Sequence, residues 1–401
     1  MAILLVVLAG CTPQGEGGGK TGRAEPMCPL KNQPVAAFQT ALLELAFDAP
    51  ASMPVVPHLK NRSRIQGTVV TACLKLGQPE LVSRFIPDIG NWRRGMAYAD
   101  MAVYCVEHDC HDVQPLLDLA AEIADTATQD WRRDRVRVRI AQAHALLGQS
   151  ELAARFAADV EPSESGKLAG TAAAVGDDEA FDAQVAALDS LIAGGQFDVM
   201  KNALLSYTQV FDRHYDNTDR RKLIEKKIES GSATLPLVVR IDLMLKMAGF
   251  ALEHRDPAGS LALVNTSQSL MDSAQWPARF GIPLRGRLAA MRFLAGDTAK
   301  ARGDVDAALA EFDSQRDAIQ SFDRGGVLRP LAEAYQQMGD AATALSIYRR
   351  AVEAGAVNPN LRPRTEDLSA TCCSMAVHGV EPDEALWKRM HDIRRSLGQP
   401  Q

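Results

Sequence analysis

The sequence predicts an all-α fold, an α-solenoid built from stacked helical hairpins. Hydrophobic residues make up 46% of its 401 residues but aromatic residues only 5%, and alanine and leucine dominate. This composition favours closely packed helices over strands, which prefer β-branched and aromatic residues. No stretch shows the apolar–polar alternation of a half-buried strand, whereas apolar residues recur at spacings of three and four, most clearly over 327–354.

The amino terminus begins with a short apolar run that ends in Leu8-Ala9-Gly10-Cys11. This resembles the lipobox of bacterial lipoproteins, and the resemblance implies that residues 1–10 are a signal peptide and that the Cys11 thiol is lipidated. No Lys or Arg precedes the run, and the run is shorter than a usual signal. It is also too short to span a bilayer, which takes about 20 apolar residues.

Residues 11–30 have the Gly-rich, polar composition of a flexible tether. Such a tether would hold a folded body close to a membrane, so we expect a lipid-anchored protein of the bacterial cell envelope. Thr12 stands where the lipoprotein family places an Asp for inner-membrane retention. In a bacterium with two membranes this favours the outer membrane, facing the periplasm.

Residues 31–398 form the predicted solenoid. A first helix covers Ala36 to Phe47, and helical hairpins are predicted over 65–87, 92–125, 131–160, 283–312 and 327–354. Between them, 163–194 and 197–230 are helical in composition, and long helices are predicted from Pro236 to Leu252 and from Pro257 to Met271. Trp92-Arg93-Arg94 and Trp131-Arg132-Arg133 read as two copies of one repeat start, 39 residues apart. Residues 231–235 allow a division into two lobes, and Thr365 to Leu397 reads as a terminal cap.

The clearest hairpin is 327–354. Its first helix is predicted from about Pro330 to Met338 and ends at Gly339, because glycine accepts the left-handed conformation that closes a helix. Asp340 is placed to cap the second helix. The apolar stripe of that helix consists of Ala341, Ala344, Leu345, Tyr348 and Ala351. A lone hairpin cannot bury such faces, so stacked neighbours are implied.

This stretch resembles a tetratricopeptide repeat, a helical hairpin of about 34 residues. The matching residues are Leu331, Ala332, Tyr335, Gly339, Ala344, Tyr348 and Ala351, while Leu328 replaces the family's tryptophan and Pro359 falls late. Parts of the pattern recur at Ile140, Ala141, Gly148 and Ala153, and at Leu288, Ala289, Gly296, Ala301 and Ala308. The resemblance implies a concave surface that binds a protein or peptide.

In that family the first helix of each hairpin lines the groove. By position the resemblance assigns Arg135, Arg139 and Gln142, and Arg329, Glu333 and Gln336, to this surface. Arg135 and Arg139 belong to an arginine run, and arginine suits carboxylate recognition. The groove would therefore suit an acidic peptide segment. The alternative is a solvated helix face whose arginines pair with Asp130, Asp134 and nearby acids.

The net charge of −6 argues against a nucleic-acid partner. We expect no enzyme, cofactor or catalytic residue, since no phosphate loop, HExxH or GxSxG motif is present. His214-Tyr215-Asp216 is predicted to be a surface loop. Cys372 is predicted to be buried on a stripe with Leu368 and Met375, whereas Cys373 points elsewhere.

Cys105, His108, Cys110 and His111 cluster in sequence and leave three alternatives open: a metal site, a disulfide or structural residues. We predict no metal. The function predicted is a membrane-anchored protein–protein interaction scaffold. The alternatives are an enzyme or metal-binding subunit with its site near Cys105–His111, and a purely structural subunit of an envelope complex.

Overall fold

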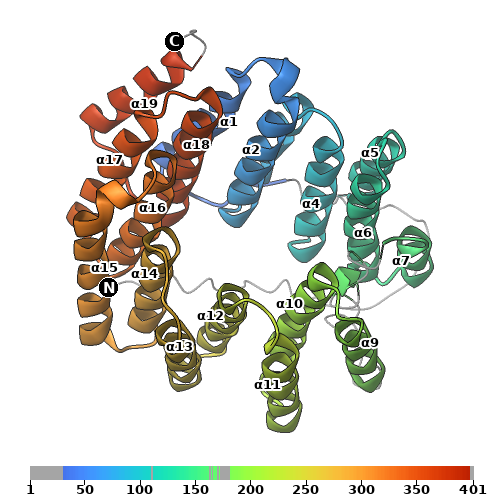
Figure 1. Cartoon of the computed structure of the whole chain (residues 1–401). Coiled ribbons are helices and arrows are strands. Elements are labelled where there is room, and N and C mark those ends of the chain that lie inside the picture. Colours follow the sequence, from blue (N-terminus) through green and yellow to red (C-terminus); the bar gives the residue numbers. More distant parts are fainter. Residues whose placement is uncertain are drawn as a thin grey trace, which may run out of the picture.

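The computed structural model describes residues 30–109, 112–161, 164, 166–168, 171 and 181–397. Within these ranges every regular element is a helix, so the all-α solenoid is confirmed. The inner helices are α2 (Val55–Lys75), α4 (Arg93–Glu107), α6 (Asp130–Leu146), α10 (Phe197–Arg213), α12 (Leu237–Glu253), α14 (Ala278–Leu294), α16 (Ser321–Gln337) and α18 (Leu361–His378). Together they face the middle of a ring (Figure 1).

An outer layer of helices covers the inner one. It consists of α1 (Ala37–Ala51), α3 (Pro79–Phe85), α5 (Gln114–Asp125), α7 (Ser150–Ala157), α9 (Phe181–Ala193), α11 (Thr218–Ser232), α13 (Pro257–Asp272), α15 (Thr298–Gln315), α17 (Ala341–Ala356) and α19 (Glu384–Ser396), with 3-10 turns η1 (Ile86–Asp88) and η2 (Arg316–Ala318). Most inner helices form an antiparallel hairpin with the outer helix that follows them, and the next inner helix packs beside them. Consecutive inner helices are therefore parallel.

The α16–α17 hairpin shows how the local sequence specifies a repeat. Gly339 adopts φ +79° between the helices, and the Asp340 carboxylate accepts a hydrogen bond from Thr343 N at 3.1 Å. Tyr335 and Tyr348 are almost fully buried at 2% and 0% exposure. Both the glycine stop and the aspartate cap occur where the sequence predicts them.

Some predicted helix boundaries are wrong. Helix α16 begins at Ser321 rather than near Pro330, and α14 likewise begins at Ala278 and contains Pro283. Proline removes one backbone hydrogen bond and usually interrupts a helix. Here Val327 and Leu328, which precede Pro330, are buried at 2% and 1% exposure. Their tertiary packing therefore outweighs the local cost.

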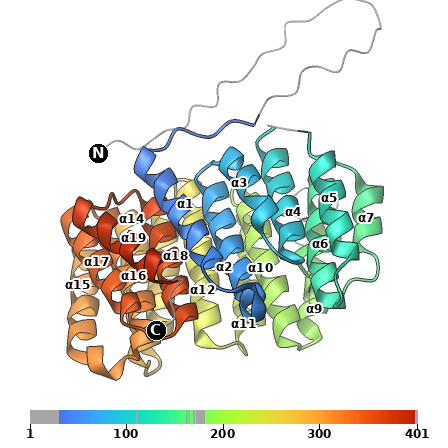
Figure 2. The same ribbon diagram turned by 90° about the horizontal axis from the view of Figure 1, so that it is seen from above.

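The ring closes through the two ends of the chain. Helix α1 packs along α18 as an outer helix does in the other hairpins, and α2 also contacts α18 (Figures 1 and 2). Helix α19 contacts α17, α18 and α1 only lightly. The predicted terminal cap is thus wrong, because α18 is an inner helix of a closed ring whose hairpin partner comes from the amino-terminal end.

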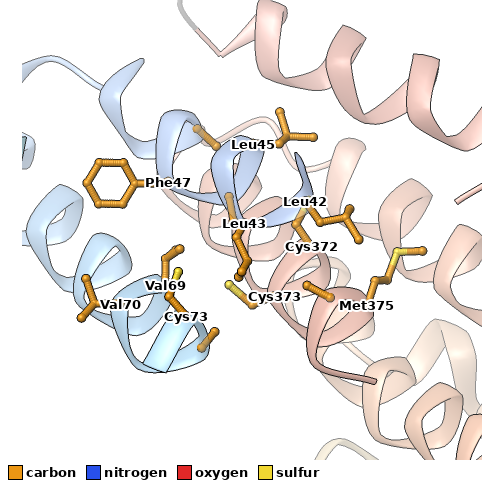
Figure 3. Packing of buried hydrophobic residues seen from close by; sticks show 14 of the residues in the cluster. Leu42, Leu43, Leu45, Phe47, Val69, Val70, Cys73, Cys372, Cys373 and Met375 are labelled. Carbon is orange, nitrogen blue, oxygen red and sulfur yellow. The ribbon is translucent and has the colours of Figure 1, made fainter. Parts of the chain in front are cut away.

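Buried side chains and hydrogen bonds hold α1 against α18 in this closure. Leu42 and Leu43 of α1 have no exposed surface, and they meet Cys372 and Met375 of α18 (Figure 3). The Gln39 side-chain amide donates to Ala376 O at 2.7 Å. The Ser369 hydroxyl of α18 donates a second hydrogen bond, to Ala46 O of α1, at 2.9 Å. The closure is therefore non-covalent but well packed.

On the far side of the ring, a few residues connect α6 to α10. The Arg135 guanidinium contacts the Glu164 carboxylate at 3.1 Å, and Ser206 Oγ donates to Gly166 O at 2.6 Å. The signal-peptide and tether predictions lie mainly outside the described residues, and the proposed joint at 231–235 falls between α11 and α12. No described helix is long and apolar enough to cross a membrane.

Candidate functional site

The main candidate site is a cavity of about 630 Å³ on the inner face of the ring. Side chains from α2, α4, α6, α16 and α18 line it. Four of its lining residues are cationic, namely Arg64, Lys75, Arg93 and Arg135, and two are acidic, namely Asp100 and Glu333. We call it the basic cavity.

Arg93 lies among several other cationic side chains in this cavity. Burial lowers its pKa, and three neighbouring guanidiniums, those of Arg135, Arg64 and Arg132, lower it further. Its own guanidinium lies 4.7 Å from the centre of the Trp92 ring. Among the described residues Arg93 has no ion-pair partner. An anionic ligand would relieve this concentration of positive charge.

Arg135, which the sequence assigns to the groove, also lines the basic cavity. Its guanidinium is 3.1 Å from the nearly buried carboxylate of Glu164 and 5.6 Å from the centre of the Trp131 ring. Trp131 in turn meets Trp92 edge-to-face, with ring centroids 5.5 Å apart. The two sequence copies Trp-Arg-Arg therefore lie side by side at the starts of α4 and α6, which orients Arg135 beside Arg93.

The other two predicted groove residues of α6 make internal contacts. The Arg139 guanidinium is 2.7 Å from the Asp100 carboxylate and donates to the Gln142 side chain at 3.0 Å. The Gln142 amide donates to Lys167 O at 3.3 Å. Arg139 lines a separate cavity near the ends of α2 and α4. Burial raises the pKa of Asp100, while Arg139 opposes this shift.

The predicted groove residues of α16 are divided between two cavities. Glu333 lines the basic cavity, where it accepts a hydrogen bond from Ser374 Oγ at 2.6 Å. Arg329 lines the adjoining cavity and lies 3.1 Å from the Asp367 carboxylate. Gln336 is half-buried, and its side-chain oxygen has no hydrogen-bond partner among the described residues.

The adjoining cavity continues the inner face towards the starts of α14 and α16. It shares Arg64, Thr68 and Cys373 with the basic cavity. Phe280 and Phe322 line it and remain 47% and 49% exposed. Its three arginines face three nearby carboxylates, so its charge is balanced, whereas cationic side chains outnumber acidic ones in the basic cavity.

Sequence reasoning missed the residues that make the cavity basic, namely Arg64, Lys75 and Arg93. Arg93 lies in the first repeated Trp-Arg-Arg start, so a signal for it was present. Arg64 and Lys75 carry no such signal, because only the closure of α2 onto α18 brings them to the same cavity. Arg64 forms an ion pair with Glu366 of α18.

The described part of the Cys105–His111 cluster does not assemble a site. Cys105 is 1% exposed in the core, whereas the His108 ring stacks on Tyr104 at 4.0 Å and its Nδ1 contacts Tyr104 O at 2.9 Å. No group of three potential metal ligands occurs among the described residues. Cys110 and His111 lie outside them, so a metal site in the four-residue cluster and a Cys105–Cys110 disulfide stay alternatives that the structure does not test.

The prediction of a surface loop at 214–216 is wrong for its first two residues. His214 and Tyr215 are 7% and 5% exposed, and only Asp216 is solvent-exposed. The Tyr215 hydroxyl donates to the Asp256 carboxylate at 2.8 Å, and its ring stacks on His254 at 4.5 Å. These contacts join α10 to α12 and α13, which explains the burial.

The structure also tests the predicted positions of Cys372 and Cys373. Cys372 is fully buried, as predicted, beside Met390. Cys373 points in a different direction from Cys372, as predicted, and is 7% exposed on the α2 side of the closure, where Cys73 is also buried (Figure 3). Burial raises the pKa of all three thiols.

Comparisons with known proteins identify no family. No protein-family model matches the chain, and no curated protein matches it either. Among solved structures, one described as a circular tandem repeat protein with novel repeat topology and enhanced subunit contact surfaces is 16% identical. That match covers 90% of this chain and 94% of the other, with a TM-score of 0.29.

Proposed function

We propose that this protein is a non-catalytic interaction scaffold whose ring binds an acidic segment of a partner protein in the basic cavity. Helical-repeat rings present many side chains on a rigid inner surface, and such surfaces commonly bind peptides or proteins. The observation that carries the proposal is the cationic excess around Arg93. Its guanidinium has cationic neighbours but no carboxylate partner among the described residues.

Carboxylates of a partner would act in two ways at this site. They would accept charge-assisted hydrogen bonds from guanidiniums, which are about twice as strong as neutral ones. They would also cancel the mutual repulsion that lowers the pKa of Arg93. Trp92 and Trp131 hold the planes of Arg93 and Arg135, which reduces the entropy lost when a ligand binds.

The anchoring part of the proposal is that Cys11 carries a lipid and that residues 11–30 tether the ring to the bacterial envelope. It rests on the lipobox-like sequence alone. Metabolic labelling with a fatty acid tests it in a full-length protein expressed in a bacterium. We expect label on the native chain and none on Cys11→Ser, and an unlabelled native chain would contradict anchoring.

Affinity capture of the full chain from the membranes of its native host tests the binding part. The native protein is compared with Arg93→Glu/Arg135→Glu and with Arg84→Glu/Arg395→Glu, which makes the same charge change at exposed ion pairs outside the basic cavity. We expect a near-stoichiometric partner that only the cavity variant loses. A partner retained by both variants would place the interface elsewhere.

A further inference from the structure

One edge of the ring concentrates exposed apolar side chains. We call it the apolar rim and define it as the first turns of the inner helices together with the loops that precede them. Among the described residues, nine of the thirteen exposed large apolar side chains lie there: Val55, Val56, Leu59, Trp131, Phe197, Val238, Phe280, Phe322 and Val357. Four of the inner helices thus place an aromatic or valine side chain at an equivalent position, with Phe197, Val238, Phe280 and Phe322 separated by 41 or 42 residues.

The same edge is basic. The first four residues of the eight inner helices include nine arginines and three aspartates, with no lysine or glutamate. This opposes the usual preference, because the positive end of the helix dipole favours acidic residues in the first turn. The outer helices follow that preference, since Asp256, Asp340 and Asp383 cap three of them through side-chain hydrogen bonds.

Several of these rim arginines are not neutralised within the chain. Arg94, Arg132 and Arg240 have no ion-pair partner among the described residues, whereas Arg279 lies 3.8 Å from Asp323. Positive side chains at positive helix ends cost folding free energy. A negatively charged surface outside the molecule would offset that cost at once for the six inner helices that carry these arginines, namely all except α2 and α10.

We infer that the apolar rim docks on an anionic lipid bilayer. A bilayer surface matches both features, since its headgroup region accepts half-buried aromatic and aliphatic side chains while anionic lipids attract nearby arginines. The apolar residues form a ring of single side chains, one or a few per repeat, rather than a deep groove. This arrangement suits a flat, extended surface. The inference goes beyond the proposed function and needs no lipid on Cys11.

The position of the amino-terminal segment is compatible with this orientation. The segment leaves from the opposite rim, where Gln33 N donates to Gly77 O at 2.7 Å. An inner helix such as α16 has 17 residues and is about 25 Å long. Residues 11–30, if extended, could span about 60 Å. An anchor at Cys11 could therefore share a bilayer with the apolar rim.

Vesicle co-sedimentation of the full chain carrying Cys11→Ser, which removes any lipid anchor, tests the inference. The probes are phosphatidylcholine vesicles and equimolar phosphatidylcholine–phosphatidylglycerol vesicles. The rim variant is Phe197→Asp/Phe280→Asp. Its matched control is Leu147→Asp/Leu294→Asp, which changes two exposed leucines at the other ends of inner helices. Circular dichroism verifies that each variant is folded.

We expect the parent protein to bind the anionic vesicles and the rim variant to bind at least about tenfold more weakly, because two added carboxylates repel the anionic surface. The control variant should bind as the parent does, and pure phosphatidylcholine should bind more weakly. Absence of binding to anionic vesicles would overturn the inference. So would equal losses in the rim and control variants, or equal binding to the two kinds of vesicle.

Discussion

At the residue scale, the basic cavity is built from charges that the fold holds at a cost. Arg93 illustrates this, because burial and three neighbouring guanidiniums all oppose its charged form. Functional sites commonly contain charged residues of this kind, whose surroundings shift their pKa and lower the stability of the folded state. The predicted site residues Arg135 and Glu333 lie in the same cavity although 198 residues separate them in the chain.

Replacement of Arg93 by glutamine should separate stability from binding. Removing one of several repelling guanidiniums should leave the free energy of unfolding unchanged or raise it by up to about 1 kcal/mol. The affinity for an acidic peptide should fall at the same time. Chemical denaturation and a peptide titration on the same sample measure both effects, and a clear loss of stability would mean that Arg93 is a structural residue.

His378, also in the basic cavity, makes stability depend on pH. Burial lowers its pKa, although the Glu333 carboxylate opposes the shift. The folded state therefore binds fewer protons than the unfolded state between the folded pKa and the ordinary value near 6.5. The contribution of neutral His378 to stability is therefore fully present above about pH 6.5, and it is lost as the pH falls towards the pKa of the folded state.

His378→Gln should flatten this dependence. We expect the native protein to lose more stability than the variant between about pH 7 and pH 5. Denaturation midpoints across this range provide the measurement, with His391→Gln on the outer helix α19 as the control. Equal slopes for the native protein and His378→Gln would show that this imidazole does not titrate differently on folding.

At the element scale, close helix contacts depend on small residues. A Cβ at Gly286 of α14 would lie 2.9 Å from Leu331 Cδ2 and 3.1 Å from the backbone of Pro330 in α16, whereas a Cβ at Gly303 of α15 would meet nothing within 4 Å. Gly286→Ala should therefore destabilise the protein by about 1–3 kcal/mol. Gly303→Ala should stabilise it by about 0.5–1 kcal/mol. Thermal melts measure both changes in stability. If both substitutions stabilised the protein, or both destabilised it, the close approach of α14 and α16 would be refuted.

Helix α1 should contribute as much as a central helix although it lies near one end of the chain. Leu43 is fully buried against α18, so Leu43→Ala should cost about 2–5 kcal/mol. Leu119→Ala, at a leucine that is 40% exposed, should cost far less. Urea denaturation measures both. Similar small losses would indicate that α1 frays and that the ring is open.

Sequence reasoning succeeded at elements whose signals are local. Gly339 and Asp340 identified a turn and a cap because their effect depends on one or two neighbouring residues. It failed at the start of α16, where Gly325 and Gly326 are poor helix formers and Pro330 suggests an end. Tertiary packing of Val327 and Leu328 decides that element, and no local pattern reveals it.

At the scale of the whole molecule, ring closure is the feature that sequence could not predict. It depends on contacts between α1 and α18, such as the one between Gln39 and Ala376, which are 337 residues apart. Each helix alone reads as an ordinary amphipathic segment. The closure also creates the basic cavity, because it brings Arg64 and Lys75 beside α16 and α18. The solenoid class was predictable, but the composition of the site was not.

A fluorescence anisotropy titration of the Cys11→Ser protein with a labelled glutamate-rich peptide, and with its glutamine counterpart, shows whether the basic cavity binds carboxylates. We predict binding of the acidic peptide alone, weaker at high salt and at least about tenfold weaker in Arg93→Glu/Arg135→Glu, since close charge pairs across interfaces contribute about 1.5 kcal/mol or more. Arg84→Glu/Arg395→Glu should bind as the parent does. Equal affinity for the two peptides, or equal losses in both variants, would contradict a carboxylate-binding role for the basic cavity.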